Sequence, residues 1–90
     1  MTDNADLANR IKSGNEGENL LNNPAFKNAM LSAKASLINR FVDSDYADND
    51  KREEVYRRLK AMDDFFEELT DIINTGTIAQ RELEAQTKPN

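Results

Sequence analysis

The side chains best suited to chemistry in this chain are carboxylates, and a first group lies near the middle of the sequence. Asp43, Asp45 and Glu54 fall at positions 1, 3 and 12 of a stretch with the length of an EF-hand calcium loop. Position 5 is Ala47, which offers no side-chain ligand, and position 6 is Asp48, where the turn requires glycine. We therefore interpret the stretch as an acidic turn that caps helices, and expect no calcium site.

A second group of carboxylates forms a denser run, here called the acidic stripe: Asp63, Asp64, Glu67, Glu68 and Asp71. Inward-facing carboxylates on bundle helices hold di-iron sites together with histidine, but the chain has no histidine. Two interpretations stay open. The stripe is either a hydrated helix face or a surface that binds a basic partner, in the extreme by imitating the phosphates of DNA.

Other patterns of enzyme chemistry are absent from the sequence. Without cysteine or histidine, the chain has neither a thiolate nor the commonest general base near neutral pH. Its serines therefore lack a histidine that could activate them, and its three glycines do not form a phosphate-binding loop. We expect no enzymatic activity, no metal, no cofactor and no small-molecule substrate.

The elements that would position these groups are helices. Apolar residues recur at alternating steps of four and three, the spacing of a stripe that packs on a partner helix. They are Val55, Leu59, Met62, Phe66, Leu69 and Ile73. With Asp50 suited to the N-cap and Gly76 just past the last apolar step, the spacing predicts a helix over 51–75.

A second helix is predicted over 24–42, because Asn23 suits an N-cap and Pro24 the first helical position. It carries two apolar stripes separated by Lys27 and Lys34. The stripe assigned to the hairpin seam is Phe26, Met30, Ala33, Leu37 and Phe41. One neighbouring helix cannot cover both stripes, so we predict a further contact, with a second copy or a partner protein. The residues predicted for it are Leu31, Ile38, Val42, Phe65 and Ile72.

The two ends of the sequence are expected to contribute little to the core. Residues 1–19 are polar and predicted to form a flexible arm, and residues 86–90 a disordered tail. A capping-box pattern after Gly76 predicts a short helix over about 78–85. The predicted fold is all-α: an antiparallel helical hairpin within residues 20–85, with a short C-terminal third helix and a flexible N-terminal arm.

Charge and hydropathy narrow the classes of partner. Seventeen acids against twelve bases give a net charge of −5, which disfavours direct binding to nucleic acid. No apolar run approaches the length of a membrane span, so we expect no membrane contact.

Three fragments carry a resemblance to a known group: Asn23-Pro24-Ala25-Phe26, Arg57-Arg58-Leu59-Lys60-Ala61 and Gly76-Thr77-Ile78-Ala79. In them the chain resembles small acidic helical proteins of tailed bacteriophages, over roughly residues 20–85. The resemblance implies a viral setting, with the host cytoplasm or the virion as the expected location and no functional residues to carry over. The leading hypothesis is a non-enzymatic virion or virion-assembly component that acts through protein–protein contacts. The alternative is an acidic inhibitor that occupies a basic, nucleic-acid-binding surface of a host enzyme.

Overall fold

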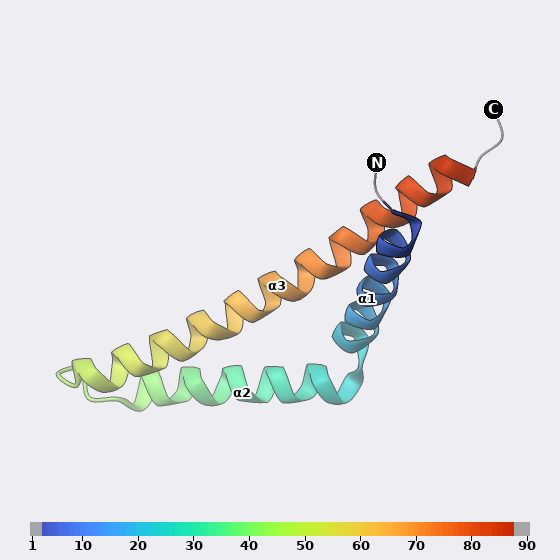
Figure 1. The fold of residues 1–90 in the computed structure, drawn as a ribbon. Coiled ribbons are helices and arrows are strands. Elements are labelled where there is room, and N and C mark those ends of the chain that lie inside the picture. Colours follow the sequence, from blue (N-terminus) through green and yellow to red (C-terminus); the bar gives the residue numbers. More distant parts are fainter. Residues whose placement is uncertain (1–2, 88–90) are drawn as a thin grey trace. The chain divides into compact units, whose positions relative to one another are not determined.

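The fold consists of three helices, seen in a computed structural model that describes residues 3–87 (Figure 1). They are α1 (Asn4–Asn22), α2 (Pro24–Asp43) and α3 (Asn49–Thr87). The chain divides into two units. In unit 1, α1 packs on the part of α3 that begins at Glu67, and in unit 2, residues Asn23–Phe66, α2 packs on the first part of α3. The all-α prediction is confirmed for the described residues, and the predicted hairpin is confirmed in part, because its second helix packs on α2 only as far as Phe66.

The prediction of a flexible arm over 1–19 is wrong for the residues that the structure describes, because they belong to α1. Leu7 is fully buried, and Gly14 and Gly17 are buried with it. The buried and half-buried side of α1 follows steps of three and four through Leu7, Ile11, Gly14, Gly17 and Leu21. A glycine in a helix interior costs about 1 kcal/mol relative to alanine, and the packing of α1 against α3 therefore outweighs this cost for two glycines.

The prediction that a helix stops at Gly76 is also wrong. The segments expected as helices 51–75 and 78–85 are one continuous helix, α3, which also includes Gln86 and Thr87 of the expected tail. Residues 88–90 lie outside the described part of the chain. Within residues 3–87 no glycine has a positive φ, so Gly76 does not adopt the left-handed conformation of a helix C-cap.

Gly76 instead lies where α1 and α3 cross most closely. A Cβ atom built on Gly76 would lie 2.9 Å from both the carbonyl oxygen of Arg10 and the Cα atom of Gly14. A Cβ atom on Gly14 would likewise lie 2.9 Å from the Cα atom of Gly76. Such distances leave no room for a side chain, so glycine is required here for the close approach of two backbones.

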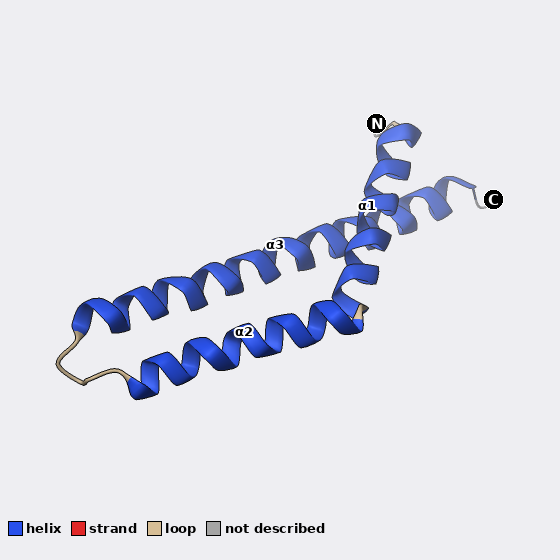
Figure 2. Cartoon of the chain, turned by 90° about the horizontal axis from the view of Figure 1, so that it is seen from below, coloured by secondary structure: helices blue, strands red, loops and turns tan. Residues whose placement is uncertain are grey.

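Unit 2 begins with the predicted helix cap. The Asn23 side chain accepts a hydrogen bond from the backbone N–H of Phe26 at 3.1 Å, and Pro24 occupies the first turn. At the far end of α2, a short turn leads into α3 (Figure 2). There the Asp48 side chain accepts a hydrogen bond from the backbone N–H of Lys51 at 3.1 Å. Asp48, rather than the predicted Asp50, therefore caps α3.

The core of unit 2 is small and partly aromatic. Leu37 of α2 and Val55 of α3 are buried. At the other end of the hairpin, Phe26 lies 6.4 Å from Phe65 and 6.3 Å from Phe66 between ring centroids. The Phe26–Phe66 pair is edge-to-face, a favourable arrangement for aromatic rings. The first part of the predicted seam, from Val55 to Phe66, therefore holds α2 to α3, whereas Leu69 and Ile73 lie in unit 1 and face Gly17 of α1.

Candidate partner-binding surface

The α2 helix leaves a line of apolar side chains uncovered, here called the α2 row: Leu31, Ala35, Ile38 and Val42. Leu31 is 66% exposed, Ile38 45% and Val42 70%, and Ala35 is exposed as well. Their steps of four, three and four repeat the spacing of a helix–helix seam. Of the twenty residues of α2, all of them described, Leu37 alone is buried. The α2 row is therefore a second seam without a partner in unit 2.

The other two residues predicted for this contact do not join the row. Phe41 of α2 contacts Arg52 of α3, and these two residues mark one face of the hairpin. The α2 row lies on the same side of the buried Leu37 as Phe41 does. An α-helix turns by about 100° per residue. Around the axis of α3, Phe65 therefore lies about 80° to one side of the buried Val55, and Arg52 lies to the other side. Phe65 therefore lies on the opposite face of the hairpin from the α2 row.

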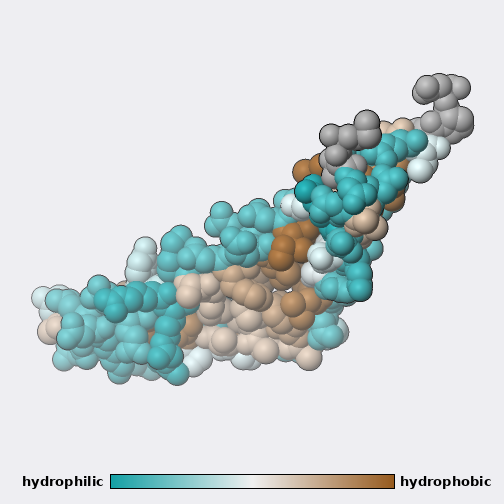
Figure 3. Space-filling view, viewed as in Figure 1, coloured by the Kyte–Doolittle hydropathy of each residue, from teal (hydrophilic) through white to brown (hydrophobic). Residues whose placement is uncertain are grey.

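Ile72, the fifth predicted interface residue, belongs to unit 1. It is 43% exposed and Phe65 is 47% exposed, so both remain accessible. The space-filling view also shows apolar residues gathered over α2 and the facing part of α3, with hydrophilic residues around the turn (Figure 3). The apolar surface of unit 2 is thus wider than the α2 row alone.

Positive charges follow the edge of the α2 row that is nearer to α3. Lys34 follows Lys27 by seven residues, and Phe41 follows Lys34 by another seven. Phe41 thus stands where a third lysine would continue the series, and there Arg52 of α3 supplies the positive charge. The guanidinium carbon of Arg52 lies 4.6 Å from the centre of the Phe41 ring. We call Lys27, Lys34 and Arg52 the cationic edge. Such positions beside a helical seam carry the charges that select partners in coiled coils.

The cationic edge is not neutralised by ion pairs within residues 3–87. The four ion pairs of this part of the chain use the bases Arg10, Arg57, Arg58 and Lys60. The ε N–H of Arg52 is buried and has no hydrogen-bond acceptor among the described residues. In a chain with a net charge of −5, three bases along one apolar row thus remain available to an external acid.

The acidic stripe lies on the exposed surface of α3. All five of its carboxylates are exposed, and Asp64 pairs with Lys60 at 3.5 Å. Asp63 and Asp64 belong to unit 2, whereas Glu67, Glu68 and Asp71 belong to unit 1. An isolated pair this exposed contributes little to stability, so the stripe is not explained as a structural ion-pair network.

The carboxylates compared with a calcium loop have local structural roles. Asp45 accepts a hydrogen bond from the backbone N–H of Ala47 at 3.3 Å, and Glu54 pairs with Arg58 at 2.8 Å. Among the described residues, no group of three or more acidic side chains is arranged to hold a metal ion. These side chains shape the turn and the first part of α3.

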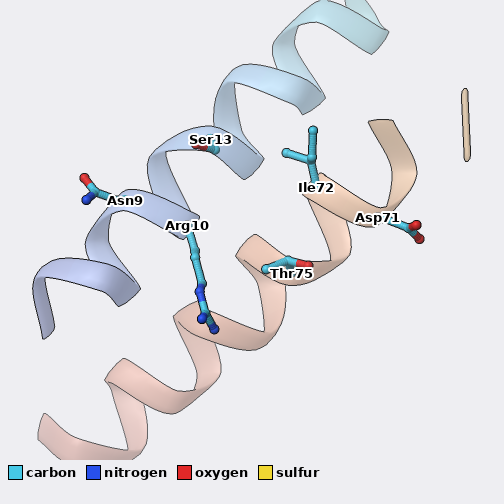
Figure 4. Close-up of a pocket in the computed structure, with 6 residues that line it drawn as sticks. All are labelled: Asn9, Arg10, Ser13, Asp71, Ile72 and Thr75. Atoms are coloured by element: carbon cyan, nitrogen blue, oxygen red, sulfur yellow. The ribbon is translucent and has the colours of Figure 1, made fainter. Parts of the chain in front are cut away.

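Two open grooves flank the glycine crossing of unit 1, each of about 270 Å³. One is lined by Asn9, Arg10, Ser13, Asp71, Ile72 and Thr75. Figure 4 shows that the Asn9 and Asp71 side chains point away from each other there, and Arg10 pairs with Asp6 at 2.9 Å. Gly14 and Gly76 line the second groove. Neither groove was predicted from the spacing of large apolar residues.

Comparisons with protein-family models, with curated proteins and with solved structures find no match. No helix within residues 3–87 combines the length and apolar character needed to cross a bilayer. The α2 row and its cationic edge are therefore interpreted from their own geometry and charge.

Proposed function

We propose that this chain acts through protein–protein contact, with the α2 row as its contact surface, and that it takes part in building or completing a tailed-phage particle. The observation that carries the proposal is the exposure of Leu31, Ile38 and Val42 at seam spacing on a well-formed helix. Surface apolar residues are common singly, but a seam-like line of them indicates an interaction site. The viral setting rests on the resemblance to small phage proteins alone.

The size of the row indicates a modest affinity. Fully burying a Val, Leu or Ile side chain is worth about 1.5–3 kcal/mol, so the exposed parts of three such side chains contribute roughly 1 kcal/mol each. That sum is smaller than the cost of bringing two proteins together. A stable complex would therefore also need charges at the edge of the row or the wider apolar face of unit 2.

Site-specific photo-crosslinking tests the contact. A photoreactive amino acid replaces Ile38 in the chain produced in a phage-infected bacterial host, and in a matched variant it replaces Ser36, an exposed residue of α2 on the other side of Leu37. We expect a discrete crosslinked product from position 38 and none from position 36. Equal products from both positions, or none from either, would contradict the proposal. Antibody detection of the chain in purified particles separates a virion component from an assembly factor.

The second candidate function is inhibition of a basic, nucleic-acid-binding surface by the acidic stripe. The observation in its favour is that all five carboxylates are exposed. The two candidates differ in the degree of their salt dependence, because a contact made by many charges weakens steeply as ionic strength rises, whereas the apolar part of a contact through the α2 row does not. If Asp63→Asn with Glu67→Gln abolishes partner binding and Ile38→Glu leaves it unchanged, the inhibitor role replaces the one proposed above.

A further inference from the structure

From the charges around the α2 row, we infer that its partner is an amphipathic helix with carboxylates on the edge that meets Lys27 and Lys34. The inference rests on the proposed function and adds the chemistry of the partner. An apolar row alone would accept many helices. The cationic edge restricts the choice, because like charges placed across a helical seam are destabilising and opposite charges favourable.

The first step is the position of the charges. Lys27 and Lys34 stand between the α2 row and the buried line through Leu37, so any helix seated on the row meets them along one edge. The opposite edge is uncharged at the corresponding turns, where Asn28, Ser32 and Asn39 stand. The electrostatic selection therefore acts on one side of the partner, at the positions of Lys27 and Lys34.

The second step is that unit 2 itself leaves these charges without a carboxylate. The ion pairs of residues 3–87 involve other bases, and Arg52 is held over Phe41 with its ε N–H unpartnered. This arrangement keeps the guanidinium of the partly exposed Arg52 on the same face of the hairpin as the row. Arginine in such stacked positions is well suited to interfaces.

The third step argues against a second α2 helix as the occupant. The twenty residues of α2 hold three bases and one acid, and that acid, Asp43, is the last residue of the helix. Two α2 helices facing each other would bring two positively charged surfaces together and supply no carboxylate opposite Lys34. A helix with acids beside its apolar row satisfies both features of the surface.

Two synthetic helical peptides test the inference on the full chain. Both have three heptads with leucine at the seam positions. One carries glutamate beside the seam and the other lysine at the same positions. Fluorescence anisotropy at about 50 mM and about 500 mM salt measures their dissociation constants. We expect the glutamate peptide to bind at least about tenfold more tightly than the lysine peptide at low salt, and the difference to shrink at high salt.

Matched variants locate the effect. Lys34→Glu should weaken binding of the glutamate peptide by about fivefold or more, and Lys34→Gln by less. Arg40→Glu is the control, because it makes the same charge change on α2 away from this edge. Circular dichroism of each variant verifies that the helices are retained.

The outcomes are distinguishable. Equal binding of both peptides, binding of neither, or equal effects of Lys34→Glu and Arg40→Glu would overturn the inference. Self-association of the chain that Ile38→Glu abolishes and Lys34→Glu leaves unchanged would also overturn it, since a second copy would then occupy the row. In that case the proposed function stands. If crosslinking from position 38 yields no product, both the proposed function and this inference are refuted.

Discussion

The close contact of α1 and α3 at Gly14 and Gly76 leads to an unusual prediction. Replacing Gly76 by alanine, which has a higher helix propensity, should destabilise this helical protein. Gly76→Ala should gain about 1 kcal/mol from propensity, as alanine does for glycine in a helix interior. Its new Cβ atom would lie 2.9 Å from the Arg10 carbonyl oxygen and from the Gly14 Cα atom. Both are backbone atoms, so neither can rotate away.

The magnitude follows from what must move. Carbon atoms pack best at about 3.5–4.0 Å, so α1 and α3 would have to separate by roughly 0.6–1 Å at the crossing. A gap of that size removes a quarter to a half of the attraction between the atoms on either side, which here include the buried Leu7 and Ala79. Overpacking typically costs about 1–3 kcal/mol. After the propensity gain of about 1 kcal/mol is subtracted, we expect Gly76→Ala to be destabilising by up to about 2 kcal/mol.

Two variants serve as controls. At Gly17 a Cβ atom would meet side-chain atoms rather than backbone: Ile73 and Leu69 at 3.3 Å and Ile72 at 3.7 Å, and these side chains can shift slightly. Gly17→Ala should therefore lie between neutral and about 1 kcal/mol stabilising. Asn74→Ala, at an exposed position of α3, measures the gain in propensity away from the crossing.

The assay is urea unfolding followed by far-UV circular dichroism, combined with amide hydrogen exchange. We expect faster exchange in α1 for Gly76→Ala, with the exchange of α2 unchanged. If Gly76→Ala is as stable as Asn74→Ala, the two backbones do not approach as closely as the structure shows, and the explanation for the glycines is refuted.

Three further predictions concern unit 2. Phe66→Ala should cost about 2–3 kcal/mol in urea unfolding, because Phe66 is half-buried against Phe26, and a loss below about 1 kcal/mol would mean that the seam lies elsewhere. Ile38→Glu should abolish partner contact and leave the helical circular dichroism signal unchanged; binding that survives the substitution would exclude the α2 row as the contact. Calcium should change neither the melting temperature nor the circular dichroism spectrum, since Ala47 and Asp48 break the loop pattern, and micromolar binding in calorimetry would contradict this.

The sequence predicted the parts of the fold whose signals are local. Asn23 and Pro24 marked the start of α2, where the predicted cap forms. The apolar steps from Val55 to Phe66 predicted the seam of unit 2. These features depend on contacts within a few residues or on a regular period of large side chains, which can be read without knowing the partner.

The two wrong predictions, a helix stop at Gly76 and a flexible N-terminal arm, share one physical cause. Glycine is a helix stop when judged locally, but at Gly14 and Gly76 its lack of a side chain serves a contact between distant segments. The spacing through Leu7, Gly14, Gly17 and Leu21 is as regular as the predicted seam, yet two of its members carry no side chain to count as apolar. A search for small residues at seam spacing would have found both α1 and the continuation of α3.

The candidate surface was predicted in part. The apolar stripe of α2 was identified from the sequence, and its three large residues are exposed as a line. Phe65 and Ile72 were grouped with it because spacing along one helix does not show which face of a hairpin that helix presents. The charge at Arg52 was also missed, since its place beside the row depends on the pairing of α3 with Phe41.

The shared helix α3 sets an order in which the chain can fold as it is made. The turn between α2 and α3 closes a loop of a few residues, whereas the Gly14–Gly76 contact joins residues about 60 positions apart, an extra closure cost of about 2 kcal/mol for a flexible chain. The ribosome synthesises α1 before α2, and the part of α3 on which α1 packs only after α2. Leu7 and Leu21 therefore remain exposed while the hairpin forms. We expect unit 2 to nucleate folding on the ribosome, and α1 to dock only once the end of α3 has emerged.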